Sequence, residues 1–324
     1  MDHRIEIAAF GGPDAMQWVE VDLPPPGPGE VRLRHTAVGL NYIDTYHRRG
    51  VYPVALPTPL GVEAAGVVEA VGPEVAGLAP GDRVCTFGPA LGAYATARNV
   101  AAAALFPTPD AISDELAAAA LLKGCTVEFL VERCARVQPG DSVLVHAAAG
   151  GVGLLLVQWL RHTGARVIGT VSTPAKAELA RAAGADRVIV TTEEAIAPAV
   201  RDWTGGEGVR VTFDGVGMDT WEASLDATAR RGLIVSYGNA SAPVTGVALG
   251  VLAAKGSLFC TRPTAYDYYR EPAERTAGAA RMFDLLASGV LTVTIGQRFA
   301  LAEAARAHIE LEARRTVGST VLVP

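Results

Sequence analysis

Hydrophobic and polar positions are spaced differently in two parts of this 324-residue chain. Before residue 105, short apolar or alternating runs such as VRLRHTAVGL (31–40) are separated by turn-forming clusters such as LPPPGPGE (23–30). This spacing is typical of β-strands joined by turns. After QPGD (138–141), apolar runs of strand length alternate with segments of helix length. That alternation predicts βαβ units, a parallel sheet and an α/β fold.

In the second part, each of the first four predicted strands is followed by a predicted helix. The strands cover residues 142–147, 165–171, 186–190, 209–217, 232–238 and 256–262, and the helices cover 151–164, 174–184, 193–206 and 221–232. Gly164 and Gly184 are predicted to end two of these helices, because glycine readily adopts the left-handed backbone found after a last helical turn.

Helices are also expected outside this series. Residues 113–122 predict a helix capped by Ser113, Lys123-Gly124 predicts a break, and residues 125–137 predict a second helix. The tail predicts further helices at 276–289 and 301–315, and we expect it to rejoin the N-terminal part. The expected domains are therefore 1–124 together with 265–324, and 125–264 as an insert between them.

The stretch HAAAGGVG (146–153) lies between the first strand and the first helix of the βαβ series. Glycines allow another group to approach the backbone closely, and the N–H groups at a helix start attract anions. The dinucleotide fingerprint G-x-G-x-x-G is met incompletely, because Ala148 takes the first glycine place and Gly150 and Gly153 take the others. The flanking strand and helix favour a dinucleotide phosphate site over a plain turn.

The residues beyond this loop indicate which dinucleotide is bound. An NAD site carries an acidic residue about 20 positions past the loop, where it holds the ribose 2′-OH. This chain has VSTPAK (171–176) there, which offers Ser172, Thr173 and Lys176 and no carboxylate. Hydroxyls and a cation suit a 2′-phosphate, so we predict NADPH rather than NADH.

Composition indicates the cellular compartment and limits the classes of partner that the protein is expected to bind. The formal net charge is −6 and no dense basic block occurs, which argues against nucleic acid as the main partner. The four cysteines form no C-x-x-C pair and indicate reduced thiols in a cytoplasmic protein. The N-terminal residues do not resemble a signal peptide, and no membrane span is expected. The six histidines are dispersed without H-x-x-x-H, so no metal site is predicted.

Several segments resemble the zinc-free quinone oxidoreductases, a family of the medium-chain dehydrogenase/reductase superfamily that includes zeta-crystallin. They are GLNYIDTYHRRGVYP (39–53), GVEAAGVVEAVG (61–72), LKGCTVEFLV (122–131), HAAAGGVG (146–153), DGVGMDTWEASLD (214–226) and KGSLFCTRP (255–263). The resemblance covers nearly the whole chain. It implies a GroES-like β-barrel catalytic domain, a Rossmann doubly wound parallel-sheet domain, NADPH in the cleft between them, and a homodimer.

The resemblance also implies the residues of the site. The implied catalytic residues are Asn41, Asp44, Tyr46, Tyr52 and Lys123. The implied cofactor-binding residues are Asn41, Lys123, Thr126, Ala149, Gly150, Gly151, Val152, Ser172, Lys176, Gly238, Asn239, Phe259, Thr261, Arg262 and Arg314. Zinc-dependent relatives carry metal ligands in the motifs that here read NYID (41–44) and GVE (61–63), and near Leu122. Close relatives often place a tyrosine against the adenine where this chain has VTT (190–192), so NADPH affinity is expected to be lower.

A quinone can accept hydride from a nicotinamide without a metal, provided that hydrogen-bond donors meet the charge growing on its oxygen. Tyr46, Tyr52, Asn41 and Lys123 are the candidate donors. Asp44 is expected to orient its neighbours, because an unperturbed aspartate is ionised near neutral pH. One-electron and two-electron transfer both stay open. The alternatives to a quinone reductase are an NADPH-dependent reductase of activated alkenes, such as enones and enals, and a low-turnover NADPH-binding or RNA-binding protein.

Overall fold

The chain folds into two compact units. In the computed structural model, which describes residues 1–324, unit 1 comprises Met1–Lys123 and Val293–Pro324, and unit 2 comprises Gly124–Thr292. The chain returns to unit 1 at residue 293 rather than at the expected residue 265. Helix α9 (Pro272–Ala287) explains the difference, since its Met282 lies against Gly124 and its Arg281 contacts Glu132, both in unit 2.

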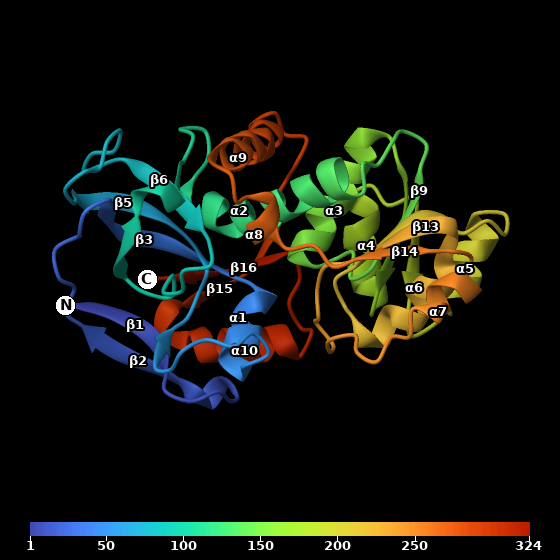
Figure 1. Cartoon of the computed structure of the whole chain (residues 1–324), viewed down its shortest axis with the longest axis horizontal. Coiled ribbons are helices and arrows are strands. Elements are labelled where there is room, and N and C mark those ends of the chain that lie inside the picture. Colours follow the sequence, from blue (N-terminus) through green and yellow to red (C-terminus); the bar gives the residue numbers. More distant parts are fainter. The chain divides into compact units, whose positions relative to one another are not determined.

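Unit 2 contains a six-stranded sheet in which all neighbouring strands are parallel (Figure 1). Its strands are β9 (Ser142–Val145), β10 (Arg166–Val171), β11 (Arg187–Val190), β12 (Val209–Asp214), β13 (Thr228–Ser236) and β14 (Phe259–Thr261). Their spatial order is β11-β10-β9-β12-β13-β14. Numbered from β9, this is the order 3-2-1-4-5-6 of a doubly wound dinucleotide-binding fold, as predicted.

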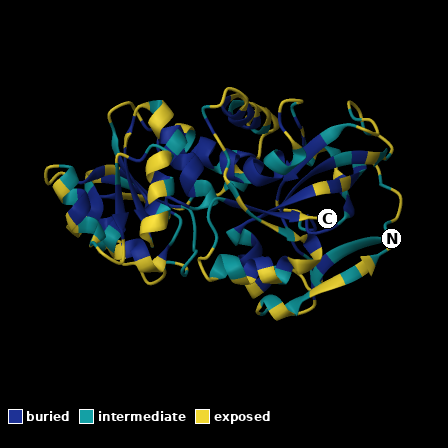
Figure 2. Ribbon diagram, turned by 180° about the vertical axis from the view of Figure 1, so that it is seen from behind, coloured by how far each residue is buried: buried dark blue, intermediate teal, exposed yellow.

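Besides α9, unit 2 contains further helices. They are α3 (Gly151–Thr163), α4 (Pro174–Ala182), α5 (Ile196–Trp203), α6 (Trp221–Ala227), α7 (Gly250–Ala254) and α8 (Ala265–Tyr268). Leu144, Ile168 and Ile189 point to one face and pack against Ala199 and Val200 of α5. Figure 2 shows the strands buried beneath more exposed helices and loops.

Two of the predicted element boundaries are wrong. Lys123-Gly124 does not break a helix: α2 runs from Asp114 to Glu128 and continues as a π-helix, Phe129–Cys134. Gly124 serves packing instead, because a Cβ there would lie 2.4 Å from Cγ of Met282. The expected helix 221–232 ends at Ala227, after which β13 begins. The caps predicted at Ser113 and Gly164 are confirmed, since the Ser113 hydroxyl accepts the Leu116 N–H and Gly164 has φ 86°.

Unit 1 is built on two sheets. The smaller has the order β2-β1-β4, with β1 (Asp2–Ile7), β2 (Met16–Val21) and β4 (Thr58–Pro59). The larger contains β15 (Ile295–Ala300), β16 (Ser319–Val323), β3 (Glu30–Leu40), β5 (Glu63–Val71), β6 (Arg83–Phe87) and β8 (Leu105–Pro107) in that order, with β7 (Ala97–Ala101) also paired to β3. Two further helices, α1 (Tyr42–Arg49) and α10 (Ala304–Glu312), complete the unit.

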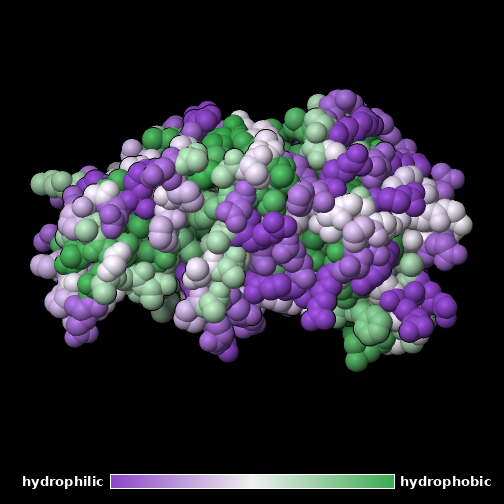
Figure 3. All heavy atoms as spheres, turned by 90° about the horizontal axis from the view of Figure 1, so that it is seen from above, coloured by the Kyte–Doolittle hydropathy of each residue, from purple (hydrophilic) through white to green (hydrophobic).

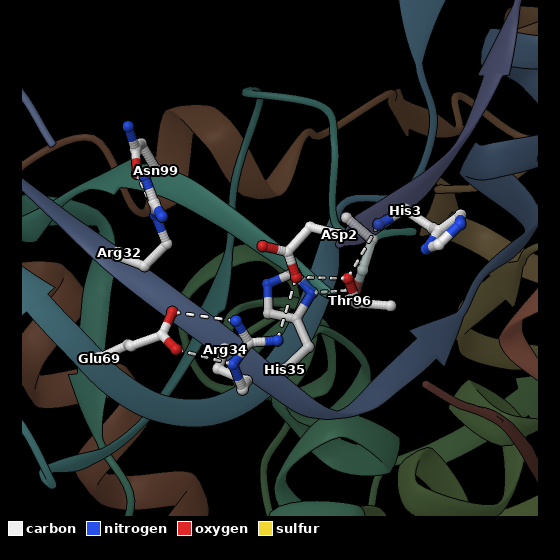
Figure 4. A network of polar contacts seen from close by, with 9 residues as sticks. Asp2, His3, Arg32, Arg34, His35, Glu69, Thr96 and Asn99 are labelled. Atoms are coloured by element: carbon white, nitrogen blue, oxygen red, sulfur yellow. Dashed lines mark hydrogen bonds and ion pairs between the residues drawn. The ribbon is translucent and has the colours of Figure 1, made fainter. Parts of the chain in front are cut away.

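Alternation along β3 explains how this sheet buries one face. Val31 and Leu33 are buried in one core cluster with Val68, whereas Arg32 and Arg34 point outward. The Arg34 guanidinium lies between the carboxylates of Asp2 and Glu69 (Figure 4). Exposed ion pairs of this kind contribute only about 0.2–1 kcal/mol each, so the apolar cluster dominates the stability of the sheet.

The outer surface mixes hydrophilic and hydrophobic residues on the face seen in Figure 3. None of the helices is both long enough and apolar enough to cross a bilayer.

Candidate active site and cofactor site

In unit 1, the predicted catalytic residues gather where α1 follows β3. Asn41 precedes the helix, and Asp44 forms a capping box with it: the Asp44 carboxylate accepts the Asn41 backbone N–H at 2.8 Å. A capping box satisfies helix N–H groups that otherwise lack partners. It also fixes the start of α1, and with it the direction of the Asn41 side chain.

Glu63, at the first position of β5, is the centre of this group and was not singled out from the sequence. Its side chain is fully buried and accepts three hydrogen bonds. The donors are Asn41 Nδ2 at 2.8 Å, Lys123 Nζ at 3.3 Å and the Leu122 backbone N–H at 2.6 Å. In the sequence, this residue could have been recognised as a carboxylate that directly precedes the apolar run AAGVV (64–68). The Glu63 carboxylate therefore holds both Asn41 and Lys123 in place.

Gly39 provides the space that the Glu63 carboxylate occupies. A Cβ at position 39 would lie 2.4 Å from Glu63 Oε2 and 2.3 Å from the Ala118 carbonyl oxygen. Contacts this short do not occur between real atoms, so any side chain at position 39 would displace Glu63 or α2.

Tyr46 and Tyr52, two of the predicted catalytic residues, lie together. Their ring centroids are 5.3 Å apart in an edge arrangement, and the backbone N–H of Tyr52 bonds to the Tyr46 carbonyl at 3.3 Å. Gly50, with φ 73°, ends α1 and turns the chain back so that Tyr52 meets Tyr46. Lys123 and Thr126 lie three residues apart on α2, which places them on the same side of that helix.

Asp44 is inaccessible to solvent. It is fully buried, and the hydroxyl of Tyr94 donates to its Oδ2 at 2.9 Å. Burial raises the pKa of Asp44 to about 7, although the Asn41 N–H, the Tyr94 hydroxyl and Lys123 oppose this. The contacts are those of an orienting group. The premise that this carboxyl has an ordinary pKa is wrong.

In unit 2, the predicted pyrophosphate loop joins the carboxyl end of β9 to α3. Gly150 is the N-cap of α3, and the loop enters it through Ala147, which has φ 52°. A Cβ on Gly153 would lie 2.2 Å from the Ala147 carbonyl oxygen, so this glycine is required for packing. A Cβ on Gly150 would meet only that oxygen, at 3.3 Å. The packing of the protein therefore demands a glycine at 153 far more than at 150.

The alanine in the first glycine place is accommodated by the neighbouring strand. Ala148 is buried, and a Cβ on Gly169 of β10 would lie 2.7 Å from the Ala148 Cβ. The position without a Cβ is therefore on the neighbouring strand β10 rather than in the loop. The incomplete fingerprint thus keeps the close packing of loop and sheet.

The predicted 2′-phosphate residues follow β10. Ser172 lies just before Thr173, the N-cap of α4, whose hydroxyl oxygen accepts the Lys176 backbone N–H at 3.3 Å. The first turn of α4 contains no acidic residue. Ser172 and Lys176 are both half-buried. A helix start with a lysine and hydroxyl groups is suited to binding a phosphate.

The other predicted cofactor residues fall into three places. Gly238 is held by Arg262, whose Nη1 donates to the Gly238 carbonyl at 2.9 Å. Phe259 and Thr261 are on the edge strand β14, with Phe259 62% exposed. Arg314 belongs to unit 1, just past α10, with φ 59°. No three His, Cys, Asp or Glu side chains gather as a metal site.

Comparison with known proteins identifies the class first. Residues 27–110 match the family model "Alcohol dehydrogenase GroES-like domain", and residues 151–273 match "Zinc-binding dehydrogenase". The chain is thus a member of the medium-chain dehydrogenase/reductase superfamily, with the predicted GroES-like and Rossmann folds.

Individual relatives identify the family. The chain is 51% identical to a quinone oxidoreductase of Pseudomonas aeruginosa over the full length of both. It is 47% identical to the crystal structure of Escherichia coli quinone oxidoreductase complexed with NADPH, with a TM-score of 0.97 over 99% of this chain and 100% of that one. It is 45% identical to a 2-haloacrylate reductase of Burkholderia over 97% of this chain and 96% of that protein. The chain belongs to the zeta-crystallin-like quinone oxidoreductase family.

The raised pKa of Asp44 gives a prediction about stability. The folded state keeps this proton to a higher pH than the unfolded state, so ionisation of Asp44 should lower the free energy of unfolding as pH rises from about 4 to about 7. An Asp44→Asn variant lacks that ionisation. Its stability relative to the native protein should therefore increase with pH in this window, by at most about 1.4 kcal/mol per pH unit. Urea unfolding at several pH values measures this, with exposed Asp14→Asn as the matched control. Parallel curves for Asp44→Asn and the native protein would contradict it.

Proposed function

We propose that this protein is an NADPH-dependent quinone reductase that works without zinc. The observation that carries the proposal is a pair of features in unit 2. The first is the loop at the carboxyl end of β9, in a sheet of order 3-2-1-4-5-6. The second is the start of α4, which contains Lys176 and no acidic residue. The first feature suits a pyrophosphate and the second suits a 2′-phosphate. Relatives named quinone oxidoreductase, among them one solved with NADPH, support it.

The catalytic residues supply hydrogen-bond donors. NADPH, when bound, provides a hydride. Lys123, Asn41, Tyr46 and Tyr52 would stabilise the negative charge that develops on the quinone oxygen. Glu63 keeps the Lys123 ammonium and the Asn41 amide fixed before the reaction, so little reorganisation is needed when charge appears. Asp44 holds the start of α1 and remains inside the protein.

The test is NADPH oxidation, followed by the loss of reduced-nicotinamide absorbance, with 1,4-benzoquinone, a larger ortho-quinone and an enone in parallel. Each acceptor is repeated with NADH. We expect turnover of a quinone with NADPH and much slower turnover with NADH. Binding of NADPH without turnover of any acceptor would refute the proposal and favour a binding role.

A second candidate is the reduction of activated alkenes. The 45% identity to a 2-haloacrylate reductase favours it, because that relative spans almost the whole chain. The same donors would serve, since reducing an enone also places charge on a carbonyl oxygen. Turnover of the enone alone in the acceptor panel would establish this function in place of quinone reduction.

The 2′-phosphate site can be tested by Lys176→Ala. NADPH should bind about tenfold more weakly, because a charge-assisted hydrogen bond is lost, while NADH binding should not change. Fluorescence titration of both cofactors measures this. Arg181→Ala is the matched control: Arg181 is another cation on α4, paired with Glu178 on the surface. Equal loss of affinity for NADPH and NADH would contradict the assignment.

We also propose that the protein is a homodimer formed through unit 2. Strand β14 ends the sheet, so its outer edge is unpaired by any other strand, and Phe259 on it is 62% exposed. Leu249, just before α7, is 79% exposed. Apolar side chains beside an open strand edge are typical of a surface that another chain covers.

Light scattering should give twice the mass of one chain. Leu249→Glu should shift the protein toward the monomer, because a charge would be buried at the interface. Ile309→Glu, at an exposed apolar position in unit 1, is the control and should leave the mass unchanged. A native protein with the mass of a single chain would refute the dimer.

A further inference from the structure

A chain of buried polar side chains crosses the carboxyl ends of three neighbouring strands in unit 2. Thr170 comes from β10, His146 follows β9, and Asp214 ends β12, while Ser224 reaches them from α6. All four side chains are nearly or completely buried. Buried polar groups need hydrogen-bond partners, and these four supply them to one another. None of them belongs to the predicted site.

The hydrogen bonds have a fixed direction. Ser224 donates to Asp214 Oδ2 at 2.7 Å, so its oxygen is available to accept from His146 Nε2 at 3.1 Å. The proton of His146 is therefore on Nε2, and Nδ1 accepts from the Thr170 hydroxyl at 3.0 Å. Burial lowers the pKa of His146, which keeps the ring neutral as this arrangement requires.

Two loops adjoin these four side chains. His146, an inner member of the set, is followed directly by Ala147 and the pyrophosphate loop. Asp214, at one end of the set, accepts the backbone N–H groups of Val216 and Gly217 at 2.9 and 3.0 Å, which shapes the turn after β12.

The turn after β12 is hydrogen-bonded to the segment that carries Gly238 and Asn239. The Ser241 N–H donates to the Val216 carbonyl, and the Tyr237 N–H donates to the Asp214 carbonyl, both at 2.8 Å. A Cβ on Gly238 would lie 2.2 Å from the Gly215 carbonyl oxygen, so the two segments are in close contact.

We propose that His146 is a positioning residue for cofactor binding: through Ser224 and Asp214 it fixes the pyrophosphate loop relative to the segment of Gly238 and Asn239. This inference rests on the proposed function, because it assumes that both segments bind NADPH. His146 itself lies beneath the loop and acts through it. Preorganised loops bind more tightly because less order has to be imposed on binding.

Two substitutions test the hydrogen bonds of the two imidazole nitrogens of His146 separately. His146→Gln can place an amide N–H near the position of Nε2 and keep the bond to Ser224. His146→Asn reaches only the position of Nδ1, keeps the bond to Thr170 and loses the link to Ser224. We expect NADPH to bind about tenfold more weakly to His146→Asn and within about twofold of the native affinity to His146→Gln. Ser224→Ala removes the same link from the other side and should match His146→Asn.

A second ligand distinguishes a positioning role of His146 from general damage to the fold of the variants. Adenosine 2′-monophosphate has a 2′-phosphate and no pyrophosphate, so its binding depends on Ser172 and Lys176 rather than on the loop. Its affinity should be unchanged in all three variants. The double variant His146→Asn with Ser224→Ala should bind NADPH no more weakly than either single variant, because both remove one link.

The possible outcomes are distinct. Native NADPH affinity in His146→Asn and Ser224→Ala would overturn the inference and leave the proposed function intact. A parallel loss of affinity for adenosine 2′-monophosphate would overturn it too, since the damage would then be general. If His146→Asn does not fold, Ser224→Ala and His146→Gln still decide. Failure of the native protein to bind NADPH would refute both the inference and the proposed function.

Discussion

A carboxylate buried in a protein has to be surrounded by hydrogen-bond donors, and each unit of this chain is organised around one such group. In unit 1 it is Glu63, which accepts from Asn41, Lys123 and the backbone of Leu122. In unit 2 it is Asp214, which accepts from Ser224, Thr220 and two backbone N–H groups. Removing one partner of a buried ion pair costs about 3–5 kcal/mol, so the arrangement around Glu63 and Lys123 cannot relax cheaply.

This constraint connects stability with function. A buried ion pair adds little net stability over apolar residues of similar size, so the pair of Lys123 and Glu63 is better explained by the geometry that it imposes. The same holds for the neutral His146 between Thr170 and Ser224, which satisfies its neighbours while joining two loops. In both units, the groups predicted to meet the ligands are held by residues deeper in the protein.

The sequence predicted the elements that depend on local signals. The alternation of strand-length and helix-length segments predicted the parallel strands. Ser113 predicted a helix start, and Gly164 predicted a helix end. Predictions failed where a distant contact overrides a local signal. Gly124 resembles a break but packs against Met282, which is far away in sequence. Glu63 and Lys123 are 60 residues apart, and His146 and Ser224 are 78 apart, so neither hydrogen bond could be predicted from periodicity or composition. The pKa of Asp44 depends on burial, which only the fold reveals.

The incomplete glycine fingerprint shows how such a distant contact preserves a site. A G-x-G-x-x-G motif places glycines in one segment, yet what the sheet requires is a close approach between the loop and the strand beside it. Here the loop and the strand β10 share that requirement: Ala148 of the loop carries a Cβ, and Gly169 across from it does not. Gly153 keeps its packing role against Ala147, and Gly150 remains a glycine although the protein fills little of the space beside it. Counting glycines within the loop therefore underestimates the match, because one of the positions that matter lies 21 residues further on, in β10.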